Sequence, residues 1–109
     1  MDELVSLFRG LGDESRLQLV AELLRGPRYV DELSTALGAP QPKISRHLAY
    51  LRRSGLVKAE RKGRHVFYHL RQPESPALKE MFDLVSRSVI KAVAAAKTAA
   101  PPKKPKKRR

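Results

Sequence analysis

The stretch from residue 41 to residue 48 gathers polar and cationic side chains of the kinds that recognise the edges of DNA base pairs. It reads Gln-Pro-Lys-Ile-Ser-Arg-His-Leu, and its apolar residues Ile44 and Leu48 are four apart, as on the buried face of a helix. Glutamine can pair with adenine, arginine and lysine with guanine, and serine with a base or a phosphate. The side chains left for the outer face are Gln41, Lys43, Ser45, Arg46 and His47. This set predicts contacts with the bases of double-stranded DNA.

Two further groups of cations suit the phosphate backbone. Arg52 and Arg53 follow on the same predicted helix, beyond its first turns. The other group, Arg61, Lys62 and Arg64, surrounds a glycine in a turn between two predicted strands. A cationic hairpin tip of this kind lies along the DNA backbone or enters the minor groove. The alternative is that these are ordinary solvated side chains, and the order of the surrounding elements favours DNA contact over it.

The spacing of the apolar residues predicts the elements that must position these groups. The turn Gly38-Ala39-Pro40 joins two helices in the manner of a DNA-binding helix-turn-helix. Asp13 occupies the N-cap position of an earlier helix. Helices are predicted over residues 1–9, 14–25, 30–37, 41–54 and 77–96, and strands over 56–60 and 65–70. The fold class is therefore mainly α with a small β-hairpin, a winged helix-turn-helix of order α-α-α-α-β-β-α.

Length, charge and composition narrow the function further. The 109 residues suffice for one domain, predicted over residues 1–96, and a Pro/Lys-rich tail over 97–109 that we expect to be disordered. The net charge is +12, and six of the 23 basic residues lie in residues 103–109. Without those six, 17 basic residues against 11 acidic still leave +6, which favours a polyanionic partner. The tail is expected to bind phosphates non-specifically, or only to solubilise the chain.

Composition also argues against several other classes of protein. The absence of cysteine excludes disulfides and thiolate chemistry. The apolar runs are far shorter than the roughly 20 residues that cross a bilayer. We therefore expect a soluble protein of the cytoplasm, with no membrane partner.

Three stretches resemble the ArsR/SmtB family of bacterial winged-helix repressors. They are residues 11–17 (Leu-Gly-Asp-Glu-Ser-Arg-Leu), residues 41–57 with the recognition helix and its exit, and residues 62–68 (Lys-Gly-Arg-His-Val-Phe-Tyr). The resemblance covers roughly residues 4–95. It implies a homodimer built from the first and last helices, which binds an inverted-repeat operator of its own or a neighbouring operon. It also implies a bacterial protein associated with the nucleoid, and release from DNA by a signal. The residues leave that signal open between a small organic molecule, a protein partner and simple autoregulation.

The residues themselves favour a dimer as well. The first and last helices carry more apolar surface than a small monomer readily buries. The alternative is that both helices simply cover the core of the monomer. The predicted interface residues are Leu4, Leu7, Phe8, Met81, Val85 and Val89.

The metal sites that recur in the family lack their ligands in this chain. Tyr29 and Asp31 stand where a Cys-Val-Cys pair would open the third helix, and they suit a soft metal poorly. Glu80 and Asp83 lie on the last helix, but no histidine accompanies them. Elsewhere, His65 and His69 share one face of a strand about 13 Å apart, too far for one ion, and His47 is assigned to DNA. No metal or cofactor is expected.

Three other functions compete with a sequence-specific repressor. An architectural DNA binder with little sequence preference would use the same basic wing and tail. A protein-interaction module would need apolar anchors on the helix at residues 41–53, which is polar instead. An enzyme is not expected, because the acidic pairs at residues 31–32 and 80–83 fit exposed helix faces and no nucleophile–base arrangement accompanies them.

Overall fold

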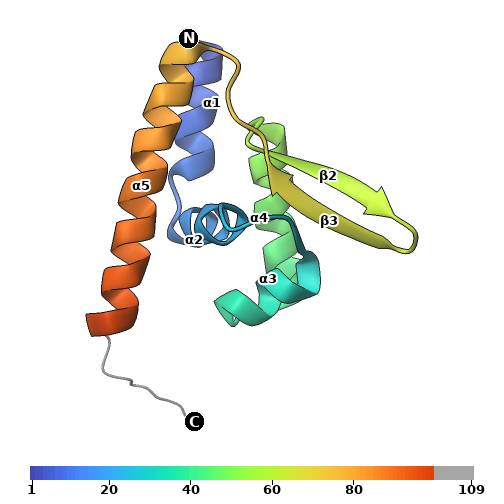
Figure 1. Cartoon of the computed structure of the whole chain (residues 1–109). Coiled ribbons are helices and arrows are strands. Elements are labelled where there is room, and N and C mark those ends of the chain that lie inside the picture. The colour runs from blue at the N-terminus through green and yellow to red at the C-terminus, as the bar shows by residue number, and fades with distance from the viewer. Residues whose placement is uncertain (100–109) are drawn as a thin grey trace.

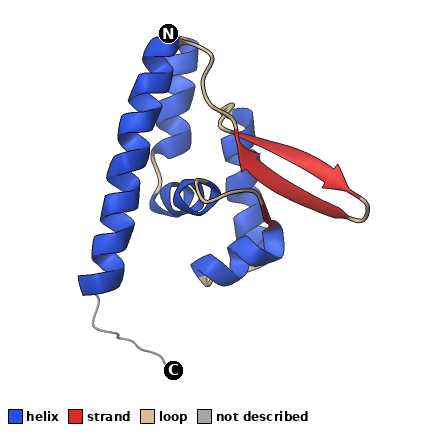
Figure 2. Ribbon diagram, viewed as in Figure 1, coloured by secondary structure: helices blue, strands red, loops and turns tan. Residues whose placement is uncertain are grey.

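The computed structural model describes residues 1–99, with the side chains of residues 96–99 excepted. Five helices and three strands follow one another along this part of the chain (Figures 1 and 2). The helices are α1 (Asp2–Leu11), α2 (Glu14–Leu23), α3 (Val30–Leu37), α4 (Gln41–Arg53) and α5 (Pro76–Ala99). The strands are β1 (Arg28–Tyr29), β2 (Val57–Lys62) and β3 (His65–Leu70). The predicted winged helix-turn-helix fold is confirmed.

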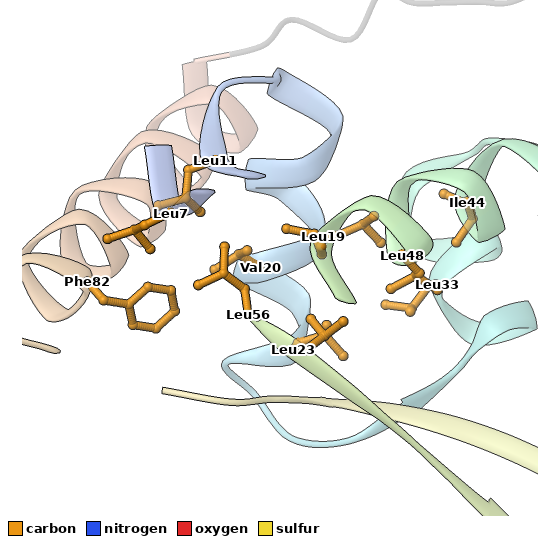
Figure 3. Close-up of a cluster of buried hydrophobic side chains, with 12 residues drawn as sticks. Leu7, Leu11, Leu19, Val20, Leu23, Leu33, Ile44, Leu48, Leu56 and Phe82 are labelled. Carbon is orange, nitrogen blue, oxygen red and sulfur yellow. The ribbon is translucent and has the colours of Figure 1, made fainter. Parts of the chain in front are cut away.

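Helix α2 is the centre of the molecule, since it packs against α1, α3, α4 and α5. Figure 1 shows α1 lying beside the upper part of α5, with the hairpin of β2 and β3 projecting away on the opposite side. Leu19 and Val20 of α2 are fully buried, and Figure 3 places them between Phe82 of α5 and Leu48 of α4. One apolar core therefore joins the two layers that flank α2.

The sheet has one strand more than the sequence predicts. β1 pairs with β3 in antiparallel register, Arg28 with Tyr68 and Tyr29 with Phe67, which gives the order β1-β3-β2. Two residues cannot show the alternation by which a strand is recognised, so β1 depends on long-range pairing. The hairpin is also longer than expected: pairing continues to Lys62 and His65, so the connection is two residues instead of four.

Both terminal helices extend beyond their predicted ends. α1 continues to Leu11 and includes Gly10, where a Cβ atom would meet Ser54 and the Leu56 side chain at 2.9 Å. Glycine is present there for close packing and does not end the helix. α5 continues to Ala99, three residues beyond the predicted end of the helix, because alanine-rich sequence favours helix. The rest of the predicted tail, residues 100–109, lies outside the described residues.

Candidate nucleic-acid interface

The recognition helix α4 is held by an apolar face and a tight turn. Ile44, Leu48 and Leu51 are fully buried, as predicted from their spacing. Gly38 ends α3 in a left-handed conformation with φ of 64°, which glycine adopts without strain. The hydroxyl of Ser34 donates a hydrogen bond to the carbonyl of Ala39 across the same turn. The angle between α3 and α4 is thus set by contacts that leave the opposite face of α4 open.

Four of the five predicted base-reading residues lie on that open face. Gln41, Lys43, Ser45 and Arg46 are exposed, and α4 contains no acidic residue to neutralise the two cations. None of the four side chains is engaged by another described side chain. These donors and acceptors are available to a ligand approaching the N-terminal half of the helix.

His47 is the exception among the predicted base-reading residues. Only 17% of its side chain is exposed, and its Nδ1 atom lies 3.8 Å from Oδ2 of Asp13 at the start of α2. The prediction that His47 lies on the outer face of α4 is therefore corrected, because its side chain is directed toward the start of α2. The signal was available, because His47 is three residues from Ile44 and four from Leu51, on the edge of the buried stripe.

Asp13 caps α2 as predicted, by accepting a hydrogen bond of 3.1 Å from the amide of Arg16. Partial burial acts to raise the pKa of Asp13. The Arg16 amide hydrogen bond and the charges of His47 and Arg16 outweigh it, so the pKa is lowered from its ordinary value. The Asp13 carboxylate at the start of α2 is therefore held in its charged form by the groups around it.

The cations assigned to the phosphate backbone are all exposed. Arg52 and Arg53 lie at the C-terminal end of α4, roughly 16 Å along the axis from Gln41. The guanidinium carbon of Arg53 is 5.5 Å from the ring centroid of Tyr50. In the wing, Arg61, Lys62 and Arg64 are exposed around Gly63, whose φ is 62°.

One face of the sheet carries an aromatic cluster that sequence reasoning missed. The ring of Tyr29 lies edge-on to His65 at 5.4 Å and to Phe67 at 5.8 Å between centroids. Lys62 Nζ lies 5.2 Å from the Phe67 ring centroid, so this cation is partly engaged by the wing itself. His69 Nε2 is 3.3 Å from Oε1 of Glu60. The cluster stiffens the hairpin that presents the basic tip.

The residues predicted for a dimer interface divide between core and surface. Leu7 and Val89 are only 2% and 7% exposed within a single chain, so they belong to the monomer core. Leu4, Met81 and Val85 are half-buried, and Phe8 is 52% exposed. The prediction is therefore corrected for Leu7 and Val89, because α1 and α5 both pack on α2. The large apolar side chains exposed on the two helices are Val5, Phe8, Leu84 and Ile90.

The positions examined for metal binding do not converge. Asp31 and Glu80 are exposed on different helices, and Tyr29 packs against aromatic rings. Within residues 1–95, no group of three or more His, Cys, Asp or Glu side chains could hold a metal ion. No helix in the described part of the chain is long and apolar enough to span a membrane.

The fold and the open face of α4 together define a winged helix-turn-helix protein. Its helix-turn-helix consists of α3 and α4, the outer face of α4 is polar and cationic, and a basic hairpin lies beside it. Residues 13–59 match the family model described as bacterial regulatory protein, arsR family. The chain belongs to this family.

Characterised relatives are regulators of transcription. The chain is 49% identical over 74 residues to the arsenical resistance operon repressor of Escherichia coli (strain K12), covering 67% of this chain and 62% of that protein. It is 40% identical over 77 residues to the transcriptional activator HlyU of Vibrio cholerae, covering 71% of each. The chain thus spans slightly less than two thirds of the E. coli repressor.

Solved structures give the same picture. HlyU from Vibrio cholerae superposes with a TM-score of 0.67 at 38% identity, covering 79% of this chain and 90% of that one. The homodimeric winged helix-turn-helix DNA-binding domain of a possible ArsR-family regulator from Mycobacterium bovis gives 0.67 at 28% identity, covering 89% and 82%.

Proposed function

We propose that the protein is a homodimeric, sequence-specific repressor that binds an inverted-repeat operator of its own or a neighbouring operon. The observation that carries this proposal is the outer face of α4, where Gln41, Lys43, Ser45 and Arg46 are exposed and unengaged. The first turns of α4 enter the major groove, where these side chains meet base edges. The recognised relatives act on transcription, which agrees with this use of the helix.

The wing and the end of α4 supply contacts that do not depend on sequence. Arg61, Lys62 and Arg64 approach the backbone beside the groove that α4 occupies, and Arg52 contacts phosphates further along. Each phosphate neutralised releases counterions and strengthens binding to any DNA. In this division of roles, α4 determines which site is bound and the wing increases the affinity for all sites.

The dimer proposed here uses the apolar side chains left exposed on the terminal helices. Phe8 and Val5 on α1, with Leu84 and Ile90 on α5, would lose contact with water against the same helices of a second copy. The Mycobacterium bovis neighbour is described as homodimeric. A two-fold axis places two recognition helices on two half-sites and accounts for an inverted-repeat operator.

Repression is favoured over activation because the E. coli relative is named an operon repressor, although the Vibrio cholerae relative is named an activator. An effector, either a small organic molecule or a protein, would release the dimer from DNA. Such a regulator works in the cytoplasm at the nucleoid.

The test is a titration of labelled DNA from the region upstream of the protein's own gene, against scrambled DNA of equal length, at about 50 and 200 mM salt. Tight binding at the higher salt on the upstream DNA alone supports the repressor. Equal and salt-sensitive binding to both DNAs would favour the architectural binder. Selection of a duplex from a random library then locates an operator elsewhere in the genome.

A further inference from the structure

Arg16 joins three helices through one guanidinium group. Its Nε donates a hydrogen bond of 2.7 Å to the carbonyl of Gly10, and its Nη2 donates one of 3.0 Å to the carbonyl of Arg9. Both carbonyls belong to the last turn of α1, where acceptors lack intrahelical partners; the Arg9 carbonyl also accepts the amide of Gly12 at 3.3 Å. The guanidinium carbon also lies 4.1 Å from the ring centroid of Tyr50 on α4. The end of α1, the start of α2 and the middle of α4 meet at this residue.

A second contact fixes α4 to the same joint. The backbone of Arg16 and its neighbour Asp13 form the cap of α2, and Asp13 faces His47 of α4 at 3.8 Å. His47 and Tyr50 are three residues apart, so they share one side of α4. The recognition helix is thus held at two neighbouring points, on a flank of α4 that also carries Lys43 and Arg46, four residues before His47 and Tyr50 respectively.

We propose that Arg16 is a positioning residue for DNA recognition, which holds α4 at a fixed angle to α1 through Tyr50. The effect of Arg16 on DNA binding rests on the proposed function, because α1 is the helix assigned to the dimer contact. If α1 is fixed at the two-fold axis, the angle between α1 and α4 sets the separation and phase of the two recognition helices. Arg16 then determines which half-site spacing the dimer accepts.

The chemistry of the joint requires arginine. A planar guanidinium can donate to two carbonyls in its own plane while its face rests on an aromatic ring. A lysine carries one compact ammonium group that cannot satisfy both carbonyls and stack as well. An apolar residue of similar length would leave the carbonyl of Gly10 to water, take one of two donors from the carbonyl of Arg9 and remove the link to Tyr50.

The first experiment measures the preferred half-site spacing. The probe is the duplex that the wild-type protein selects from a random library, with derivatives carrying one base pair more or less between half-sites. One base pair rotates a half-site by about 34°. Arg16→Met and Tyr50→Leu are expected to bind the selected duplex about tenfold more weakly. Scrambled DNA should be bound equally well by Arg16→Met; Tyr50→Leu also removes the ring beside Arg53, so only Arg16→Met serves for the comparison with scrambled DNA. The loss of affinity that these two variants show when the spacing is altered should be about threefold or less.

Three variants make the result interpretable. Tyr50→Phe keeps the ring and should keep the wild-type spacing preference, and Arg16→Lys should resemble Arg16→Met. Arg25→Ala removes an exposed cation in the turn after α2, outside the joint, and should change nothing. A general loss of stability would weaken binding to every duplex alike, so an unaltered spacing preference in Arg16→Met and Tyr50→Leu would overturn the proposal.

A second measurement needs no DNA. The chain has no cysteine, so Glu3→Cys on α1 and Ala49→Cys on α4 can be spin-labelled selectively, in dimers diluted with unlabelled protein. Arg16→Met is expected to broaden or shift the distance distribution, and Tyr50→Phe to preserve it. An unchanged distribution in folded Arg16→Met, checked by circular dichroism, would overturn the positioning role. If the wild type selects no duplex, the proposed function fails, and the distance measurement still decides the role of Arg16.

Discussion

Replacing Arg64 by alanine should flatten the dependence of DNA binding on salt. Arg64 lies in the two-residue connection of the wing, exposed and without a described acidic partner. Each phosphate contact contributes about 0.9 to the slope of log affinity against log salt concentration, so two wings per dimer contribute about 1.8. Between 50 and 200 mM salt, a difference of 1.8 in slope corresponds to about a tenfold smaller loss of affinity for the variant.

Fluorescence anisotropy with a selected and a scrambled duplex over four salt concentrations gives both slopes. The matched control is Arg25→Ala, because Arg25 is 67% exposed in the turn after α2, outside the wing, with Glu22 at 4.0 Å. Both duplexes should show the same reduction in slope with Arg64→Ala and none with Arg25→Ala. An unaltered slope for Arg64→Ala, or equal reductions in both variants, would mean that Arg64 in the wing does not contact phosphates.

Four further predictions concern specificity, assembly, acid stability and packing. Arg46→Ala should reduce the binding free energy by about 1–3 kcal/mol on the selected duplex and by little on scrambled DNA. Equal losses on both duplexes would mean that Arg46 contacts phosphates. Leu84→Asp should yield monomers by light scattering, and a persistent dimer would move the interface elsewhere. The lowered pKa of Asp13 contributes stability above the pKa of the unfolded chain, near 3.9, that is lost as pH falls through the folded value. Asp13→Asn keeps a cap but no charge, so its stability in urea should approach that of the wild type as the pH falls below about 3.9, and a difference that does not shrink there would contradict this. Leu19→Ala, at a fully buried site, should destabilise by about 2–5 kcal/mol in the same assay, and a loss below about 1 kcal/mol would contradict the packing.

The residues of α4 show what sequence alone can predict. Ile44, Leu48 and Leu51 repeat with the helical period, so the buried face and therefore the outer face follow from local spacing. His47 lies on the boundary between the two faces, and its direction depends on Asp13, more than 30 residues earlier. Local periodicity cannot supply a contact of that range.

The terminal helices show a second limit of the same kind. An apolar stripe indicates that a helix face leaves water, but not which surface covers it. Leu7 and Val89 are covered by their own chain, whereas Phe8 and Leu84 remain exposed. The difference depends on how α1, α2 and α5 cross, which is a property of the assembled core. β1 was missed for a related reason, since its two residues are a strand only because β3 lies beside them.

The register of the hairpin has a consequence for the geometry of the wing in a groove. Arg61 pairs with Val66 and Lys62 with His65, so the two cations project from opposite faces of the sheet. A hairpin that enters a groove edge-on therefore offers one positive charge to each wall, and the phosphates of the two DNA strands share the wing between them. Adding a single residue to β2 before Arg61 would exchange the faces and set each cation against the other wall. The number of residues in the hairpin therefore determines, together with the basic residues themselves, on which face each positive charge lies.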